Sequence, residues 1–225
     1  GPRRRIAILA HGYSSEGAAM GGFGRYYRDE LGFSVLMPDA RGHGASEGDY
    51  IGFGWHERLD YLRWIDWVVA REGPDCEIIL HGISMGGATV LMTGGEALPP
   101  QVRAIVSDCA YTSAYEELAY QLKRMYRLGD KPFLPATSRL TQRRAGYGFE
   151  EASALEQVKK AKVPILFIHG GADTFVPTEM VYRLAEACPT VKVVFIVPNA
   201  GHGLAWTADP EGYRRTLKAF LDRWS

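Results

Sequence analysis

The sequence is poor in the features that mark several broad classes of protein. Its three cysteines, Cys76, Cys109 and Cys188, form neither a C-x-x-C pair nor a cysteine and histidine pattern for zinc. This argues against a disulfide framework and predicts no metal site, so we expect buried, reduced cysteines. Lysine plus arginine and aspartate plus glutamate both number 26, and without net charge we expect no nucleic-acid partner.

Long apolar runs are also missing. No segment reaches the roughly 18 apolar residues of a membrane span, and the N-terminus lacks the apolar core of a signal peptide. We therefore expect the chain as given to be soluble and cytoplasmic, with no membrane partner, and to be a monomer or dimer. Gly1 and Pro2 are typical of the remnant of a cleaved tag, so native residues, including a membrane anchor, could precede the first strand.

Six short apolar segments have the length of β-strands. They are rich in Val, Ile, Leu and Phe without strict alternation, as expected for strands buried on both faces. Segments with helical periodicity lie between them, which predicts the α/β fold class: a doubly wound, mostly parallel sheet of about six strands. The predicted strands are 5–10, 33–38, 76–80, 102–108, 163–169 and 191–197, and the predicted helices are 22–31, 57–71, 85–96, 178–187 and 211–224.

The segment 111–155 breaks this alternation. It is rich in Tyr, Arg and Lys, and residues 115–128 and 134–147 are predicted to form two helices. An insertion after a strand end commonly serves as a lid over a site, and an ordinary solvated excursion with a basic face is an equal alternative. We therefore treat residues 1–225 as one domain with a small helical lid at about 111–155.

The motif Gly82-Ile83-Ser84-Met85-Gly86-Gly87 lies between a predicted strand and a predicted helix. This context favours a sharp turn that presents Ser84 as a nucleophile, because side chains at the flanking glycines would collide with the backbone. A phosphate cradle is excluded, since Ala88 stands where a lysine is needed. No G-x-G-x-x-G follows the first strand, so we expect no dinucleotide and no other cofactor.

A base and an acid for this serine are sought at later strand ends. His202, in a glycine-rich loop after the last strand, is the histidine that fits the order serine, acid, histidine. Asp173 and Asp108 both follow predicted strands, and either could cap a turn. We favour Asp173, because the acid usually follows the strand before the one that carries the histidine.

An oxyanion hole would require two backbone N–H groups near the serine. Met85 supplies one and Tyr13 the other, with Gly12 allowing close approach of the substrate. We also expect Gly12, Tyr111 and Val176 to contact the substrate.

Two further segments are interpreted as structural. The glycines and charges of residues 39–46 predict a rigid loop packed near Ser84. Trp64 and Trp67, on the same predicted helix as Leu59, Ile65 and Val68, are expected to lie in the core and not to form a platform for a sugar or base.

These motifs together resemble the α/β-hydrolase superfamily across nearly the whole chain. Residues 46–54 and 108–113 are similar to a bacterial group of small esterase-like proteins related to serine aminopeptidases and cinnamoyl esterases. The resemblance implies the α/β-hydrolase fold without its first two strands. It also implies hydrolysis of a small-molecule carboxylic ester of small to medium acyl size, through an acyl-enzyme formed on Ser84 with His202 and Asp173.

Other reactions stay open at this point. An aminopeptidase, an acyl-peptide hydrolase or a thioesterase could use the same three residues, and a binding module could keep the fold without activity. An aminopeptidase needs acidic side chains to hold the substrate amine, and the lid segment, which is basic, offers no obvious pair.

Overall fold

Six parallel strands form a single sheet in the order β2-β1-β3-β4-β5-β6. The computed structural model describes residues 4–225, so Gly1 and Pro2 lie outside the described residues. The parallel α/β sheet predicted from the apolar segments is confirmed. The strands are β1 (Arg5–Ala10), β2 (Ser34–Leu36), β3 (Glu77–Ile83), β4 (Val102–Asp108), β5 (Ile165–Gly170) and β6 (Lys192–Val197).

The central strands are buried on both faces. In β1, Ile6 and Ile8 belong to one hydrophobic cluster, whereas Ala7 and Leu9 belong to a second cluster on the opposite face. This follows from the period of two along a strand, which sends successive side chains to opposite sides. A strand of this kind must be apolar at nearly every position, as its sequence is.

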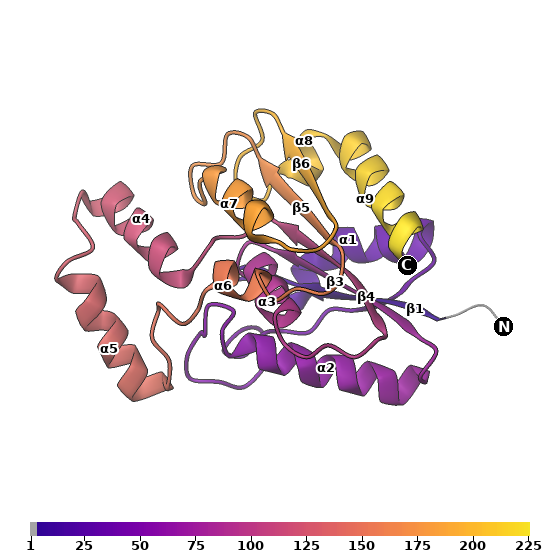
Figure 1. Cartoon of the computed structure of the whole chain (residues 1–225), viewed down its shortest axis with the longest axis horizontal. Helices are drawn as coiled ribbons and strands as arrows, with labels where there is room; N and C mark the ends of the chain where they lie inside the picture. Colours follow the sequence, from indigo (N-terminus) through magenta and orange to yellow (C-terminus); the bar gives the residue numbers. More distant parts are fainter. Residues whose placement is uncertain (1–3) are drawn as a thin grey trace.

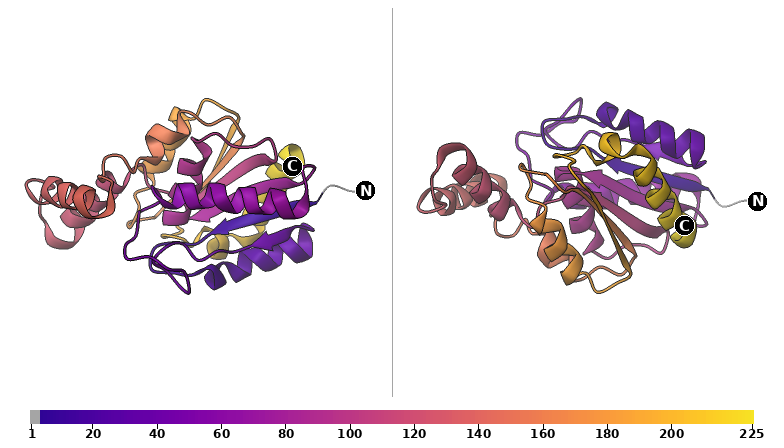
Figure 2. Two further views of the ribbon diagram at one scale, coloured as in Figure 1. Left: turned by 90° about the horizontal axis from the view of Figure 1, so that it is seen from below. Right: turned by 90° about the horizontal axis from the view of Figure 1, so that it is seen from above.

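Helices cover both faces of the sheet, with α2 over one face and α9 over the other (Figure 2). Most helix bounds agree with the prediction to within two residues. The first face carries α2 (Glu57–Glu72), α3 (Met85–Gly94), α6 (Ala154–Val158) and α7 (Glu179–Ala187). The second carries η1 (Gly17–Met20), α1 (Gly21–Arg25), η2 (Tyr26–Glu30), α8 (Ala205–Ala208) and α9 (Pro210–Trp224).

The structure differs from the prediction at the sheet edges and in the first helix. Val193 and Val194 of β6 are 37% and 40% exposed, because an edge strand has a neighbour on one side only. The expectation that this strand is buried on both faces is therefore wrong for its first half. The single helix predicted at 22–31 is divided into short 3-10, α and π segments, and β2 is three residues long.

The segment after β4 forms two helices, α4 (Ala114–Tyr126) and α5 (Phe133–Ala145). Ser113 caps α4 by accepting a hydrogen bond from the Glu116 backbone N–H at 3.1 Å. The two helices lie together at the end of the molecule opposite the C-terminus (Figures 1 and 2). Among residues 4–225, no helix has the length and apolar character required to cross a bilayer.

A buried chain of hydrogen-bonded side chains lies between the sheet and the helices η2 and α9 on its second face. The Tyr27 hydroxyl lies 3.0 Å from His81 Nδ1, and the Tyr213 hydroxyl lies 3.2 Å from His81 Nε2. Tyr213 also donates to Asp108 Oδ2 at 3.0 Å. Burial raises the pKa of Asp108 to about 6, although the bond from Tyr213 opposes this shift.

Leu9 tests how strongly the double-sided burial stabilises the chain. Replacing this fully buried side chain (Leu9→Ala) should lower the free energy of unfolding by about 2–5 kcal/mol. The variant loses the free energy of burying the removed atoms and also leaves a cavity in the core. The matched control Leu59→Ala, at a side chain that is 43% exposed on α2, should change it far less. Urea unfolding of the three proteins measures both values, and equal losses would contradict this account of the core.

The raised pKa of Asp108 predicts a pH dependence of stability. Folding favours the protonated form of Asp108. The stabilisation of the folded state by this group is therefore complete below about pH 4 and is lost as the pH rises through about 6. Asp108→Asn lacks this titration, so its stability relative to the parent protein should rise by about 3 kcal/mol between pH 4 and pH 7.

Urea unfolding at the two pH values measures this change. Asp66→Asn, at an exposed carboxylate of α2, is the control and should follow the parent protein. Parallel curves for Asp108→Asn and the parent protein would show that Asp108 does not titrate in this range.

Candidate active site

Ser84 lies on a sharp turn between β3 and α3. Its φ of 57° and ψ of −119° are in a region that residues other than glycine seldom adopt. A Cβ at Gly82 would lie 2.1 Å from the Gly86 carbonyl oxygen, and a Cβ at Gly86 would lie 2.1 Å from that of Ala10. Close backbone contacts therefore require both glycines, and the turn presents Ser84 at the N-terminus of α3.

Ser84, His202 and Asp173 form one hydrogen-bonded chain at the carboxyl ends of β3, β5 and β6. His202 Nε2 lies 2.8 Å from Ser84 Oγ, and His202 Nδ1 lies 2.8 Å from Asp173 Oδ2. An ionised carboxylate can only accept a hydrogen bond, so Nδ1 carries the proton and donates a hydrogen bond to Asp173. The lone pair of Nε2 is then available to the Ser84 hydroxyl proton.

Asp173 is held in its charged form by four donors. Its Oδ1 accepts the backbone N–H groups of Phe175 and Val176, both at 2.9 Å, and its Oδ2 lies 3.3 Å from His169 Nε2. Burial opposes ionisation, but the hydrogen bonds from His169 and His202 outweigh it and hold the pKa of Asp173 well below its ordinary value. The carboxylate can therefore stabilise a positive charge on His202 at neutral pH.

Asp108, the alternative acid, lies deeper in the protein. Tyr213 donates to its Oδ2, and its Oδ1 has no partner among residues 4–225. The structure therefore brings Asp173 to His202 and leaves Asp108 in the polar chain beneath the sheet.

The other five histidines are hydrogen-bonded elsewhere in the framework. Each lies in the core or in a loop near the site, and within residues 4–225 none of the five forms a hydrogen bond with Ser84. Their partners are Gly12 and Ala40 for His11, Ser14 and Arg41 for His43, Tyr50 for His56, Tyr27 and Tyr213 for His81, and Asp173 and Val176 for His169.

The backbone N–H groups of Met85 and Tyr13 were predicted to form the oxyanion hole. Within the described residues, no hydrogen bond engages the N–H of Met85, at the start of α3, or that of Tyr13. Gly12 packs against the serine, because a Cβ at this position would lie 3.5 Å from Ser84 Cβ. The geometry is compatible with the predicted oxyanion hole.

A cavity of about 180 Å³ opens beside Ser84. Tyr111 and Val176, two of the residues expected to contact the substrate, line it together with Ser84 and Met85. The wall is mainly aromatic and aliphatic, and helix α4 forms one side of it. The remaining lining residues are Tyr13, Phe53, Ala114, Glu117, Leu118, Gln121 and Phe175.

A lid helix over the site was one of the two alternatives for this segment, but sequence reasoning missed the polar residues that α4 contributes to this wall. Glu117 and Gln121, four residues apart, lie on one face of the helix, and Glu117 is buried. The interpretation of this segment as basic overlooked them, because Lys123 and Arg124 lie exposed at the far end of α4. An acidic residue within the apolar spacing of Ala114 and Leu118 was the available signal.

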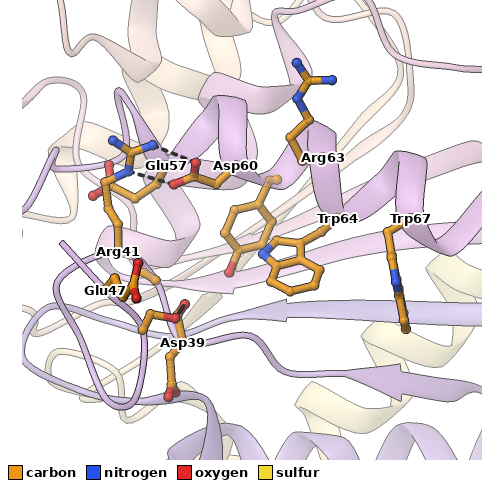
Figure 3. Close-up of a pocket in the computed structure, with 11 residues that line it drawn as sticks. Asp39, Arg41, Glu47, Glu57, Asp60, Arg63, Trp64 and Trp67 are labelled. Atoms are coloured by element: carbon orange, nitrogen blue, oxygen red, sulfur yellow. Dashed lines mark hydrogen bonds and ion pairs between the residues drawn. The ribbon is translucent and has the colours of Figure 1, made fainter.

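A larger cavity, of about 500 Å³, lies between α2 and residues 39–47 (Figure 3). Its main charges are already paired: Arg41 contacts both oxygens of Asp60 at 2.6 and 2.7 Å, and Glu57 accepts two backbone N–H groups. The cavity contains no activated nucleophile, so its size alone does not make it the active site.

The segments that border this larger cavity were interpreted as structural. Asp39 accepts the backbone N–H groups of Gly17 and Ala45, which supports the prediction of a rigid loop. Trp67, however, is 47% exposed and lines the cavity, so its assignment to the core is wrong. Trp64 is half-buried, Leu59 is exposed, and Ile65 and Val68 are buried as expected.

One group of side chains could geometrically hold a metal ion. Cys109, Asp173 and His202 offer ligand atoms within 4.8 Å of one another, and residues 4–225 contain no other such group. Both ring nitrogens of His202 are already engaged, and burial raises the pKa of the Cys109 thiol well above its ordinary value. A metal would require a thiolate and a displaced imidazole, so these residues fit the hydrogen-bonded chain better than a metal site.

Curated proteins of similar sequence extend beyond this chain. The chain is 33% identical over 193 residues to "Uncharacterized protein YqkD" of Bacillus subtilis, which covers 86% of this chain and 63% of YqkD. It is 27% identical over 197 residues to "Uncharacterized protein YfhR" of Escherichia coli K12, with coverage of 85% and 61%. The chain therefore spans less than two thirds of the length of these relatives.

Solved structures support the same fold. The esterase Pf2001 of Pyrococcus furiosus matches with a TM-score of 0.77 and 25% identity, over 99% of this chain and 84% of that one. A monoacylglycerol lipase of Paleococcus ferrophilus matches with a TM-score of 0.67 and 21% identity, over 96% and 93%. The family model described as "Alpha/beta hydrolase family" matches residues 7–216, and the chain thus belongs to the alpha/beta hydrolase family.

Proposed function

We propose that this chain is a serine hydrolase that cleaves carboxylic esters of small to medium acyl groups. The hydrogen-bonded chain from Ser84 through His202 to Asp173 is the observation that carries the proposal. Similarity to the esterase Pf2001 supports the reaction class. In this proposal the partner is a small-molecule ester.

Acylation begins at the Ser84 hydroxyl. Its oxygen attacks the ester carbonyl carbon while His202 Nε2 accepts the hydroxyl proton. Asp173 stabilises the imidazolium through the bond to Nδ1, and the N–H groups of Met85 and Tyr13 stabilise the oxyanion. The intermediate then expels the alcohol, which takes the proton from His202 and leaves the acyl group bonded to Ser84.

Deacylation repeats these steps with water. His202 accepts a proton from a water molecule as the water oxygen attacks the acyl carbon. Collapse of the second intermediate releases the carboxylic acid and returns the proton to the Ser84 oxygen. The atoms balance without a cofactor, since water supplies both the hydroxyl of the acid and the proton of the alcohol.

Two structural features favour small and medium acyl groups. The cavity beside Ser84 has a volume of about 180 Å³, which is small for a ligand site, and its wall is mainly apolar. Helix α4 narrows it from one side and contacts the acid loop, with Tyr120 donating to the Thr174 carbonyl at 2.9 Å. We propose that α4 acts as a fixed part of the lid, while α5 contributes no residue to this wall.

Ser84→Ala tests the nucleophile. Hydrolysis of short-chain nitrophenyl esters should fall on the order of a million-fold, since the variant lacks the hydroxyl that forms the acyl-enzyme. A fluorophosphonate probe should label the parent protein and not the variant. Ser34→Ala, at an exposed position of β2, is the control and should keep both activity and labelling. Turnover of the esters by Ser84→Ala at the parent rate would disprove the proposal.

Asp173→Asn tests the assignment of the acid. The amide can no longer hold His202 in the required tautomer, so kcat for the same esters should fall by about 10⁴-fold. Asp108→Asn changes the other strand-end carboxyl and should retain most of the activity. A greater loss in Asp108→Asn than in Asp173→Asn would move the acid to the other strand.

A further inference from the structure

Glu117 introduces a carboxyl group into an otherwise apolar cavity wall. Its side chain projects from α4, is only 7% exposed and lines the same cavity as Ser84. The wall around it consists largely of aromatic and aliphatic residues, and among residues 4–225 no other acid and no lysine or arginine lines it. A buried carboxyl in such surroundings is unfavourable unless another group pairs with it.

The hydrogen bonds of Glu117 leave one oxygen open. Its Oε1 accepts from Gln121 Nε2 at 2.6 Å, and the same amide nitrogen donates to the Phe175 carbonyl at 2.7 Å. Gln121 is held further by Arg124, whose Nε donates to the amide oxygen at 2.9 Å. By contrast, Glu117 Oε2 is buried and has no hydrogen-bond partner in the described part of the chain.

Support of the helix does not explain this residue. Glu116, its neighbour in the first turn of α4, already contacts Thr112 and forms a two-bond ion pair with Arg183 at 2.6 and 2.9 Å. Acidic residues near a helix N-terminus are stabilising, but this effect needs no burial. Burial raises the pKa of Glu117 to about 7, with the Gln121 bond opposing the shift.

We propose that Glu117 is a specificity-determining residue that binds a hydrogen-bond donor of the substrate, an amino or a hydroxyl group on the chain that occupies the cavity. The donor group of the substrate forms a hydrogen bond with Oε2, which lacks a partner among the described residues. The rings of Tyr13, Phe53 and Phe175 contact the apolar part of the substrate. The inference rests on the proposed ester hydrolysis and adds the chemical class of the substrate.

Polar recognition of this kind discriminates strongly. A site built to hydrogen-bond a substrate group rejects analogues that lack the group, because its own buried polar atom is then left unpaired. An amino group would add charge attraction to the ionised carboxyl, whereas a hydroxyl group would bind either protonation state. A variant that removes the charge of Glu117 but keeps the shape of its side chain can therefore distinguish an amino donor from a hydroxyl donor.

Matched ester series provide the test. One series varies the end of the acyl chain, and a second varies the end of the alcohol chain; each offers methyl, hydroxyl and ammonium ends at several lengths. In at least one of the two series, the parent protein should prefer a hydroxyl or ammonium end over a methyl end by about tenfold or more in kcat/KM. Glu117→Leu should reverse this preference, and fluorophosphonate labelling of Ser84 would show that the variant is folded.

Two further variants complete the test. Glu117→Gln preserves the shape of the side chain and removes its charge. It should therefore lower the preference for ammonium ends and retain the preference for hydroxyl ends. If Glu117→Leu does not fold, Glu117→Gln alone provides the test. Glu116→Gln is the matched control and should leave the preferences unchanged. The inference is overturned if the parent protein prefers methyl ends in both series, or if both Glu117 variants keep the parent ratios. A folded parent protein that cleaves none of the esters would instead overturn the proposed function.

Discussion

The close packing of backbone around Ser84 is the constraint on which the rest of the site depends. Gly86 lies so near the Ala10 carbonyl that no side chain fits between β1 and the start of α3. This contact exists only because β3 lies next to β1 in the sheet, with α3 beginning directly at its end. The φ of 57° at Ser84 is the strain that this geometry requires, and the buried strands on either side maintain it.

Histidine side chains support the site from within the fold. His169, fully buried on β5, lies 2.9 Å from the Val176 carbonyl and 3.3 Å from Asp173, so it connects the strand to both ends of the acid turn. The low polarity of this region strengthens each hydrogen bond to Asp173. Similarly, His81 joins two tyrosines beneath the neighbouring strands. The orientation of His202 therefore depends on the buried contacts that hold Asp173 at the end of β5.

The sequence predicts most of the fold, because burial of central strands on both faces leaves a local apolar pattern and helices keep their own period. It predicts Ser84, His202 and Asp173 as a set, since their order and strand-end positions follow from the sheet topology. It fails where burial depends on distant neighbours, as at the exposed valines of β6 and at Trp67. Glu117 was missed for a similar reason: the face that α4 turns to the cavity is fixed by contacts between residues 54 apart in sequence.

The attachment of α4 to the loop that carries Asp173 has a mechanical consequence. Tyr120 and Gln121 donate hydrogen bonds to the carbonyl groups of Thr174 and Phe175. These carbonyls lie next to Asp173, whose carboxylate orients the imidazole of the catalytic base. Swinging this helix outward to admit an ester would pull on the acid loop and disturb the alignment needed for proton transfer. A substrate that enters without moving this helix would pass the side chains of Tyr13 and Phe175, which line the cavity and are 54% and 40% exposed.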